Sequence, residues 1–160
     1  MGTTTFTGPI KAGDILYTTG TTPGTDIANV GYTVMAQSAP VTQAASAGQG
    51  AGVYKTDIVI PKNSQILSIA VNKAVAWTGN ATTINVGSNA TATQLAVAGD
   101  NDLGATVGIS SIIPGNDATR AAKWLDVGTT DIQIYTKSTN TGNGVGVLTV
   151  TYIQANNLTA

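Results

Sequence analysis

The sequence predicts an all-β fold, a β-sandwich or jelly-roll-like domain preceded by an extended N-terminal arm with a short hairpin. Thr is the commonest residue, Val and Ile each outnumber Leu, and all eight acidic residues are Asp. β-branched side chains lose rotamer freedom in a helix but pack well on a pleated sheet. Short apolar segments are also separated by Gly, Pro, Asn and Asp, a spacing typical of sandwiches.

The first part of the chain is poor in large apolar side chains and rich in Thr, Gly, Ala, Gln and Pro. Within it, residues 13–18 and 30–35 predict two short strands. Pro23 and Gly24 between them suit the central positions of a type II turn, because Gly tolerates the positive φ required there. This pattern predicts a hairpin on an otherwise extended arm.

Residues 38–52 form a low-complexity stretch with no apolar periodicity and almost nothing to bury. Ordering such a segment costs on the order of 1 kcal/mol per residue, which its own contacts cannot recover. It is therefore expected to be disordered or to lie against a partner. On this basis the chain divides into an N-terminal assembly arm and linker, residues 1–52, and a β-sandwich domain, residues 53–160.

From residue 53 onward the sequence predicts strands separated by turns. The clearest is residues 65–75, where Leu67, Ile69, Val71 and Val75 alternate with smaller or polar residues and predict one buried face. The other predicted strands are residues 56–60, which end at Pro61, and residues 82–87, 94–97, 107–113, 131–136 and 144–153.

Two connections between these segments carry further expectations. Residues 138–143 are rich in Ser, Thr, Asn and Gly and are expected to close a hairpin between the last two strands. Residues 116–123 are the one stretch that could be helical, and no more than a single turn is expected there.

The distribution of charge and the absence of targeting signals argue against two classes of binding partner, nucleic acids and membranes. Charged residues make up 9% of the chain and the formal net charge is −1. Clustered Lys and Arg grip a phosphate backbone, but the seven basic residues here are scattered. No apolar run approaches the roughly 20 residues of a membrane helix, and the start of the chain lacks the features of a signal peptide. The sequence therefore predicts a soluble protein, made in a cytoplasm, that binds neither nucleic acid nor membrane.

The inventory of reactive side chains argues against catalysis. The chain has no His, Cys or Glu. These residues supply most general bases, soft nucleophiles and paired catalytic carboxylates in enzymes. A Ser-Lys or Asp-Asp arrangement could still be drawn, but no motif supports either. We therefore expect no catalytic residues, no cofactor and no enzymatic activity.

Two kinds of loop in this sequence resemble a calcium-binding loop and a phosphate-binding loop, but each lacks residues or flanking elements that the motif requires. Residues 99–104 contain the acidic pair Asp100 and Asp102, but an EF-hand loop would need a Glu where this chain has Ser111. A polar turn is the favoured interpretation, and no metal site is predicted. The glycine series at residues 48–52 and 142–146 lack the strand before and the helix after that a phosphate-binding loop requires, so they are interpreted as turns or linkers.

Aromatic side chains offer a possible carbohydrate site. Trp77 falls in a predicted turn and could be exposed for stacking on a sugar ring, and Trp124 is a second candidate. The competing and favoured interpretation is that such residues cap the end of a core, because Trp is highly buried on average.

Two stretches resemble phage head proteins. Residues 7–13, Thr-Gly-Pro-Ile-Lys-Ala-Gly, followed by Val-Gly-Tyr-Thr-Val at residues 30–34, resemble the N-terminal segment of capsid decoration (cement) proteins of tailed bacteriophages. The body resembles the sandwich domain of small phage head proteins. That part of the resemblance is carried by a strand ending in Pro at residues 58–61, Thr-Ile-Asn-Val-Gly at residues 83–87 and the closing run at residues 146–152.

The resemblance implies a non-catalytic homotrimer on the exterior of a phage capsid, synthesised in the host cytoplasm and bound to the major capsid protein. Its arms would clamp neighbouring capsomers by adding strands to a partner's sheet edge. The apolar residues that would anchor this interface are Ile10, Ile15, Leu16, Val34 and Met35.

Two alternatives remain open on the sequence. One is a glycan-binding module of a phage tail, a fibre or a surface adhesin, which would recognise sugars through aromatics near Trp77 and Trp124. The other is a capsid or matrix subunit that itself forms the shell. A long arm attached to one compact domain suits an accessory protein better than a shell subunit.

Overall fold

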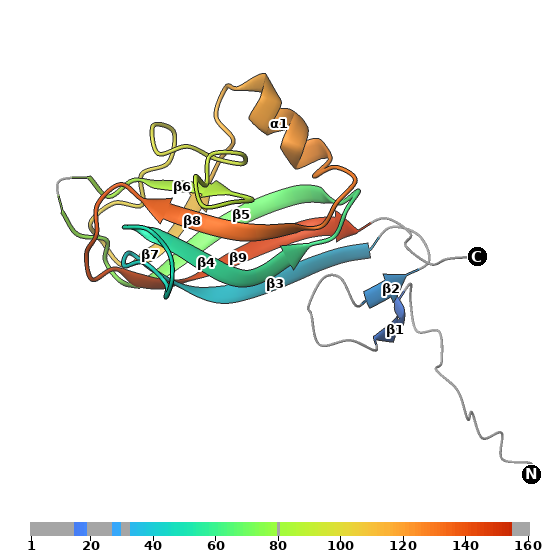
Figure 1. Cartoon of the computed structure of the whole chain (residues 1–160), viewed down its shortest axis with the longest axis horizontal. Helices are drawn as coiled ribbons and strands as arrows, with labels where there is room; N and C mark the ends of the chain where they lie inside the picture. Colours follow the sequence, from blue (N-terminus) through green and yellow to red (C-terminus); the bar gives the residue numbers. More distant parts are fainter. Residues whose placement is uncertain (1–14, 19–26, 30–32, 80, 155–160) are drawn as a thin grey trace, which may run out of the picture.

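The computed structural model describes residues 15–18, 27–29, 33–79 and 81–154, and it is a sandwich of two antiparallel sheets with one short helix (Figure 1). One sheet has four strands in the order β3-β9-β5-β7, and the other has three in the order β4-β8-β6. The predicted all-β sandwich class is confirmed. Within the described residues, no helix is long and apolar enough to cross a membrane.

The strands alternate between the two sheets along the chain. The four-stranded sheet contains β3 (Thr33–Thr42), β5 (Gln65–Val75), β7 (Gly108–Ile112) and β9 (Val145–Gln154). The three-stranded sheet contains β4 (Val53–Ile60), β6 (Ile84–Gly87) and β8 (Ile132–Ser138). A separate hairpin pairs β1 (Ile15–Thr18) with β2 (Ile27–Asn29), and the helix α1 spans Ala118–Leu125.

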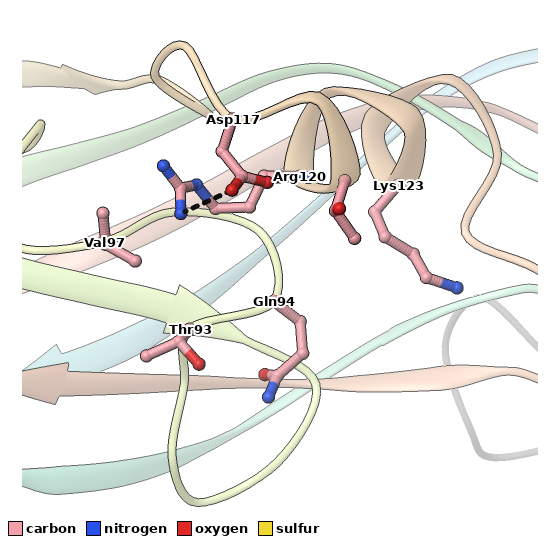
Figure 2. A pocket seen from close by; sticks show the side chains of 7 residues that line it. Thr93, Gln94, Val97, Asp117, Arg120 and Lys123 are labelled. Carbon is pink, nitrogen blue, oxygen red and sulfur yellow. Dashed lines mark hydrogen bonds and ion pairs between the residues drawn. The ribbon is translucent and has the colours of Figure 1, made fainter.

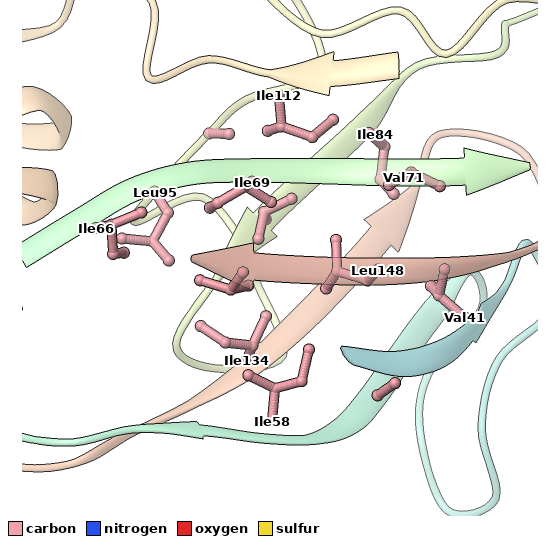
Figure 3. Close-up of a cluster of buried hydrophobic side chains, with 14 of the residues drawn as sticks. Val41, Ile58, Ile66, Ile69, Val71, Ile84, Leu95, Ile112, Ile134 and Leu148 are labelled. Atoms are coloured by element: carbon pink, nitrogen blue, oxygen red, sulfur yellow. The ribbon is translucent and has the colours of Figure 1, made fainter. Parts of the chain in front are cut away.

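The core lies between the two sheets (Figure 3). Ile69 and Val71 of β5 and Leu148 of β9 face Ile58 of β4 and Ile134 of β8, and all five are buried. Each such side chain contributes roughly 1.5–3 kcal/mol by leaving water, so this layer accounts for a large part of the folding free energy.

The predicted alternation of β5 is correct in its centre and wrong at both ends. Ile69 and Val71 are buried as expected, but Leu67 is 43% exposed and Val75 is 46% exposed, while Ile66 is buried. The pairing of β5 with β9 shifts register near each of those two exposed residues. A bulge inserts one extra residue and reverses which side chains face the core, so period-two reasoning fails on either side of it.

The second half of the predicted arm belongs to the sandwich. The strand expected at residues 30–35 is instead β3, which pairs with β9 along all ten of its residues. Residues 38–42, expected to lack structure, are part of it, and Val41 is completely buried. The segment of residues 1–52, predicted to be an arm and linker, therefore contains β3, one strand of the four-stranded sheet. Pro23 and Gly24 lie outside the described residues.

The expected hairpin between the last two strands is wrong, because β8 and β9 belong to different sheets. The connecting loop crosses from one layer to the other and packs tightly at one end of the sandwich. A Cβ on Gly144 would lie 2.6 Å from Cε3 of Trp77, so only Gly fits there. The local sequence contains turn residues but does not encode which sheet receives the next strand.

Two further segments differ from their expected structure. Residues 94–97 form no strand; they contribute only an isolated bridge between Ala96 and Val86. The helix α1 has eight residues rather than a single turn. Its N-cap is Asp117, whose carboxylate accepts a hydrogen bond of 2.9 Å from the backbone N–H of Arg120, and this satisfies one free donor of the first turn.

Side-chain amides complete the backbone pairing where strands do not meet. Gln43 donates from Nε2 to the carbonyl of Thr78 at 2.6 Å and accepts its N–H at 2.9 Å. Asn101 donates to the carbonyl of Ile113 at 2.9 Å and accepts its N–H at 2.7 Å. These amides satisfy part-buried backbone groups that no strand neighbour pairs with.

Candidate assembly surface

The feature of this fold best suited to an interaction is the side of the four-stranded sheet that points away from the core, here called the outer face. The strand pairing places its side chains in rows. One row runs from Pro40 through Val147 and Asn72 to Ile109. The members of the outer face are Val34, Ala36, Ser38, Pro40 and Thr42 of β3; Gln65, Ser68, Ala70, Asn72 and Val75 of β5; Ile109 and Ser111 of β7; and Val145, Val147, Thr149, Thr151 and Ile153 of β9.

The large apolar side chains that remain exposed concentrate on this sheet. Among the described residues, Ile109 is 74% exposed and Val34 is 64% exposed. The one such residue away from the four-stranded sheet is Leu125 on α1. Large apolar side chains gathered on one sheet favour an interaction site, whereas single ones scattered over a surface do not. The exposed members on or beside the sheet are Val34, Leu67, Val75, Val107, Ile109, Ile113, Val145 and Val147.

The outer face carries no charged residue, and the other sheet of the same protein provides the contrast. The three-stranded sheet places Lys55 and Asp57 of β4 in solvent and keeps Lys137 of β8 partly exposed, as expected of a solvated face. The charged residue of the four-stranded sheet, Lys73, is 4% exposed and points inward, where its Nζ donates to Oγ of Ser110 at 3.0 Å. The two sheets thus differ in what their outward faces are suited to contact.

The polar groups of the outer face are partly satisfied within it. Oγ of Ser38 and Oγ1 of Thr149 are hydrogen-bonded at 2.8 Å across the β3–β9 pair. A hydroxyl that already has a hydrogen-bond partner in the protein loses less when another protein covers it than a hydroxyl bonded only to water does. Apolar residues together with paired hydroxyls make a face that tolerates loss of water.

The residues that the sequence nominated as interface anchors are distributed over different parts of the chain. Val34 lies on the outer face, whereas the next residue, Met35, points the other way and packs against the core. Ile15 and Leu16 belong to β1. Ile10 lies outside the described residues.

Sequence reasoning missed the central residues of the outer face, although a signal for them was present. In β9, apolar residues occupy both alternating sets, with Leu148 and Val150 inward and Val145 and Val147 outward. A strand that is apolar on both sides is typical of one buried on both faces. The stretch from residue 103 to residue 116 also contains no charge at all.

The acidic loop is held by partners within the protein. Asp100 forms an ion pair of 3.1 Å with Arg120, and the carboxylate of Asp102 accepts hydrogen bonds from the Thr82 hydroxyl and the Gly104 N–H. These two hydrogen bonds, that of Thr82 foremost, lower the pKa of Asp102. Within the described part of the chain, no group of three or more His, Cys, Asp or Glu side chains could hold a metal ion.

A hollow of about 430 Å³ lies between α1 and the segment of residues 93–97, which belongs to the connection from β6 to β7 (Figure 2). The two cations at its edge are already engaged. The Nε of Arg120 donates to the carbonyl of Pro114 at 2.7 Å, and Nζ of Lys123 donates to the carbonyl of Val127 at 3.3 Å. The hollow therefore presents no pre-arranged nucleophile and base. It is lined by Thr93, Gln94, Val97, Asp117, Thr119, Arg120 and Lys123.

Both tryptophans pack in or against the hydrophobic core. Trp77, which the sequence suggested could be exposed, is completely buried, and its Nε1 donates to Oγ of Ser138 at 2.9 Å. Trp124 is half-buried against the core and donates to the carbonyl of Leu95 at 2.9 Å. The interpretation of Trp77 as an exposed stacking platform for sugars is therefore wrong, and that of a core-capping aromatic is correct.

Comparisons with known proteins give little further information. No protein-family model and no curated protein matches the chain. A search of solved structures finds a chain described as "Cyanophage Pam1 capsid asymmetric unit", which is 17% identical, with 92% of this chain and 99% of that chain covered and a TM-score of 0.44. A likeness this weak carries no argument about function.

Proposed function

We propose that this protein is a non-catalytic structural component of a phage head, a cement or decoration protein that binds the outer capsid surface as a homotrimer. The observation that carries the proposal is the outer face, an uncharged surface on which exposed Val and Ile side chains are interspersed with Ser, Thr and Asn. Such a surface is suited to being covered by protein.

Energetic reasoning supports an assembly role. Full burial of one Val, Leu or Ile side chain is worth roughly 1.5–3 kcal/mol, and eight such side chains are exposed on or beside one sheet. Covering a good part of them supplies enough free energy to offset the several kcal/mol lost in association. No charge of the outer face would have to be stripped of water, which removes the largest penalty that an interface can carry.

The sequence supports the head assignment and the absence of catalysis. The chain contains no His, Cys or Glu; its arm resembles that of decoration proteins of tailed phages, and its body resembles the sandwich domain of small phage head proteins. A protein that binds only the assembled shell stabilises that shell by mass action, without any chemical step. In this proposal the major capsid protein is the partner, and the arm, with Ile10, Ile15 and Leu16, adds strands to the partner's sheet edges.

The proposal is tested on particles of the phage that encodes the chain. Density-gradient fractions are probed with an antibody to the protein, and intact heads are labelled with the same antibody carrying gold. We expect co-sedimentation with heads, labelling of intact particles, and heads that rupture at lower temperature when the gene is deleted. Particles that lack the protein, or that carry it on tails alone, would overturn the proposal.

A further inference from the structure

We infer that the outer face of the four-stranded sheet is the surface through which copies of this chain pack against one another. This inference rests on the proposed capsid role and not on the threefold symmetry proposed with it. It names the occupant of the face as a second copy of the same chain, related by a two-fold axis. Self-association would then lie in the sandwich, leaving the arm available for the capsid.

Charge is the first reason for choosing a second copy. A face that meets itself across a symmetry axis brings like groups together, so any charge on it would face a similar charge. The outer face carries none, whereas the opposite sheet places Lys55 and Asp57 outward. Its one hydroxyl pair, Ser38 with Thr149, can also be covered without losing its hydrogen bond. The outer face is thus compatible with itself.

Size is the second reason. The four strands have ten, ten, eleven and five residues. With a rise of about 3.3 Å per residue and a spacing of about 4.8 Å between strands, they cover roughly 570 Å² in projection. Two such faces together exceed the roughly 1,000 Å² that a specific interface needs. The face is therefore large enough to hold two copies together without help from the arm.

The edge strand β7 is the third reason. Exposed edges are usually protected by charges, Pro or a covering segment. The other edge strand, β3, contains Pro40 and is tied to β4 through the side chain of Gln37. β7 contains neither charge nor Pro, and Ile109 in its middle is the most exposed large apolar residue of the described chain. Packing of a second copy over the outer face would remove the Ile109 side chain of this uncharged strand from water.

The test compares two apolar positions of similar exposure. Ile109 on the outer face is 74% exposed, and Leu125 on α1 is 69% exposed. The full-length protein and its Ile109→Asp, Val147→Asp and Leu125→Asp variants are measured by light scattering after size exclusion. We expect the wild type and Leu125→Asp to share a mass at least twice that of one 16.1 kDa chain, and both outer-face variants to fall to the single-chain mass.

Folding is checked separately in each variant by near-ultraviolet circular dichroism, because the buried Trp77 reports on the intact core. If Val147→Asp fails to fold, Ile109→Asp decides, since its side chain lies at the edge of the sheet and mostly in solvent. A wild type that is monomeric, or a folded Ile109→Asp variant that keeps the oligomeric mass, would overturn the inference.

Failure of this inference and failure of the proposed function give different results. A monomeric wild type that still co-sediments with phage heads would refute the self-association surface and leave the capsid role intact. An oligomer that dissociates on Ile109→Asp but is never found on heads would support the surface and refute the capsid role.

Discussion

The side-chain amide of Gln37 in β3 pairs with both backbone groups of Val59 in β4. Its Nε2 donates to the Val59 carbonyl at 2.6 Å, and its Oε1 accepts the Val59 N–H at 3.1 Å. The ladder between β4 and β8 is irregular between Lys55 and Val59, so the amide stands in for a strand neighbour and joins the two sheets along one side. The same Nε2 lies 2.7 Å from the hydroxyl oxygen of Tyr152.

Replacement of Gln37 by Met should destabilise the protein, although the two side chains are similar in size. Both backbone groups of Val59 would lose their partner, and a buried unsatisfied group costs about 1–3 kcal/mol. The free energy of unfolding, measured by urea denaturation, should fall by that order. Gln65→Met, at a half-exposed position of β5, is the matched control and should change little. Equal stability of the two variants would show that the Gln37 pair is dispensable.

The buried Tyr152 should make stability fall in alkali. Burial raises the pKa of this phenol, although the hydrogen bond from Gln37 opposes the rise. The unfolded chain ionises first, near pH 10, and the folded chain resists ionisation. The stabilising contribution is therefore fully present below about pH 10 and is lost as the pH rises toward the folded-state pKa.

Urea denaturation between neutral pH and about pH 11 checks this dependence. Tyr152→Phe should flatten the alkaline decline relative to the wild type, at some loss of stability at neutral pH. Tyr135→Phe, a half-buried position in β8, serves as the control and should keep the wild-type decline. A wild-type profile that matches Tyr152→Phe above about pH 10 would contradict the prediction.

Gly144 should not tolerate even a methyl group. A Cβ there would lie 2.6 Å from Cε3 of the buried Trp77, and overpacking of this kind typically costs 1–3 kcal/mol. Gly144→Ala should lower the thermal midpoint and alter the near-ultraviolet dichroism of the tryptophans. Gly50→Ala is the control, because a Cβ at Gly50 would meet nothing within 4 Å. Matching midpoints for both variants would mean that the loop can shift away from Trp77.

Removal of the arm should have different effects depending on where the chain is cut. A chain that starts at Thr33 keeps the ten-residue ladder of β3 with β9 and should fold, whereas one that starts at Val53 loses an entire strand and should aggregate or unfold. Circular dichroism and size exclusion distinguish these outcomes. A well-folded chain starting at Val53 would show that β3 is dispensable.

The proposed division of labour can be tested with the same shortened chain. The chain starting at Thr33 should keep its oligomeric mass and lose binding to phage heads, because the arm would make the capsid contact. In the full-length protein, replacing Ile15 and Leu16 together with Asp should have the same effect. Head binding that survives either change would show that the arm is not the clamp.

The sequence predicted those features that depend on local pattern. The bounds of β5 are those of the predicted strand, residues 65–75, and the strand that precedes Pro61 ends where expected. Prediction failed at Leu67, where one extra residue reverses which side chains of the strand face the core. It also failed for α1, whose length was underestimated and whose N-cap is Asp117. Neither a bulge nor a cap changes the composition of the segment in which it lies.

By itself, the sequence determined the fold class, because β-branched residues and regular turns favour sheets wherever the chain goes, and it determined that His, Cys and Glu chemistry is absent. The tertiary structure decided which strands are neighbours, so that β8 and β9 lie in different sheets and Trp77 fills the space beside Gly144. It also decided that Ile109 and Val147 point outward together. Those relations join residues far apart in the chain, and only the packing of two sheets against one core sets which side of each strand is left for a partner.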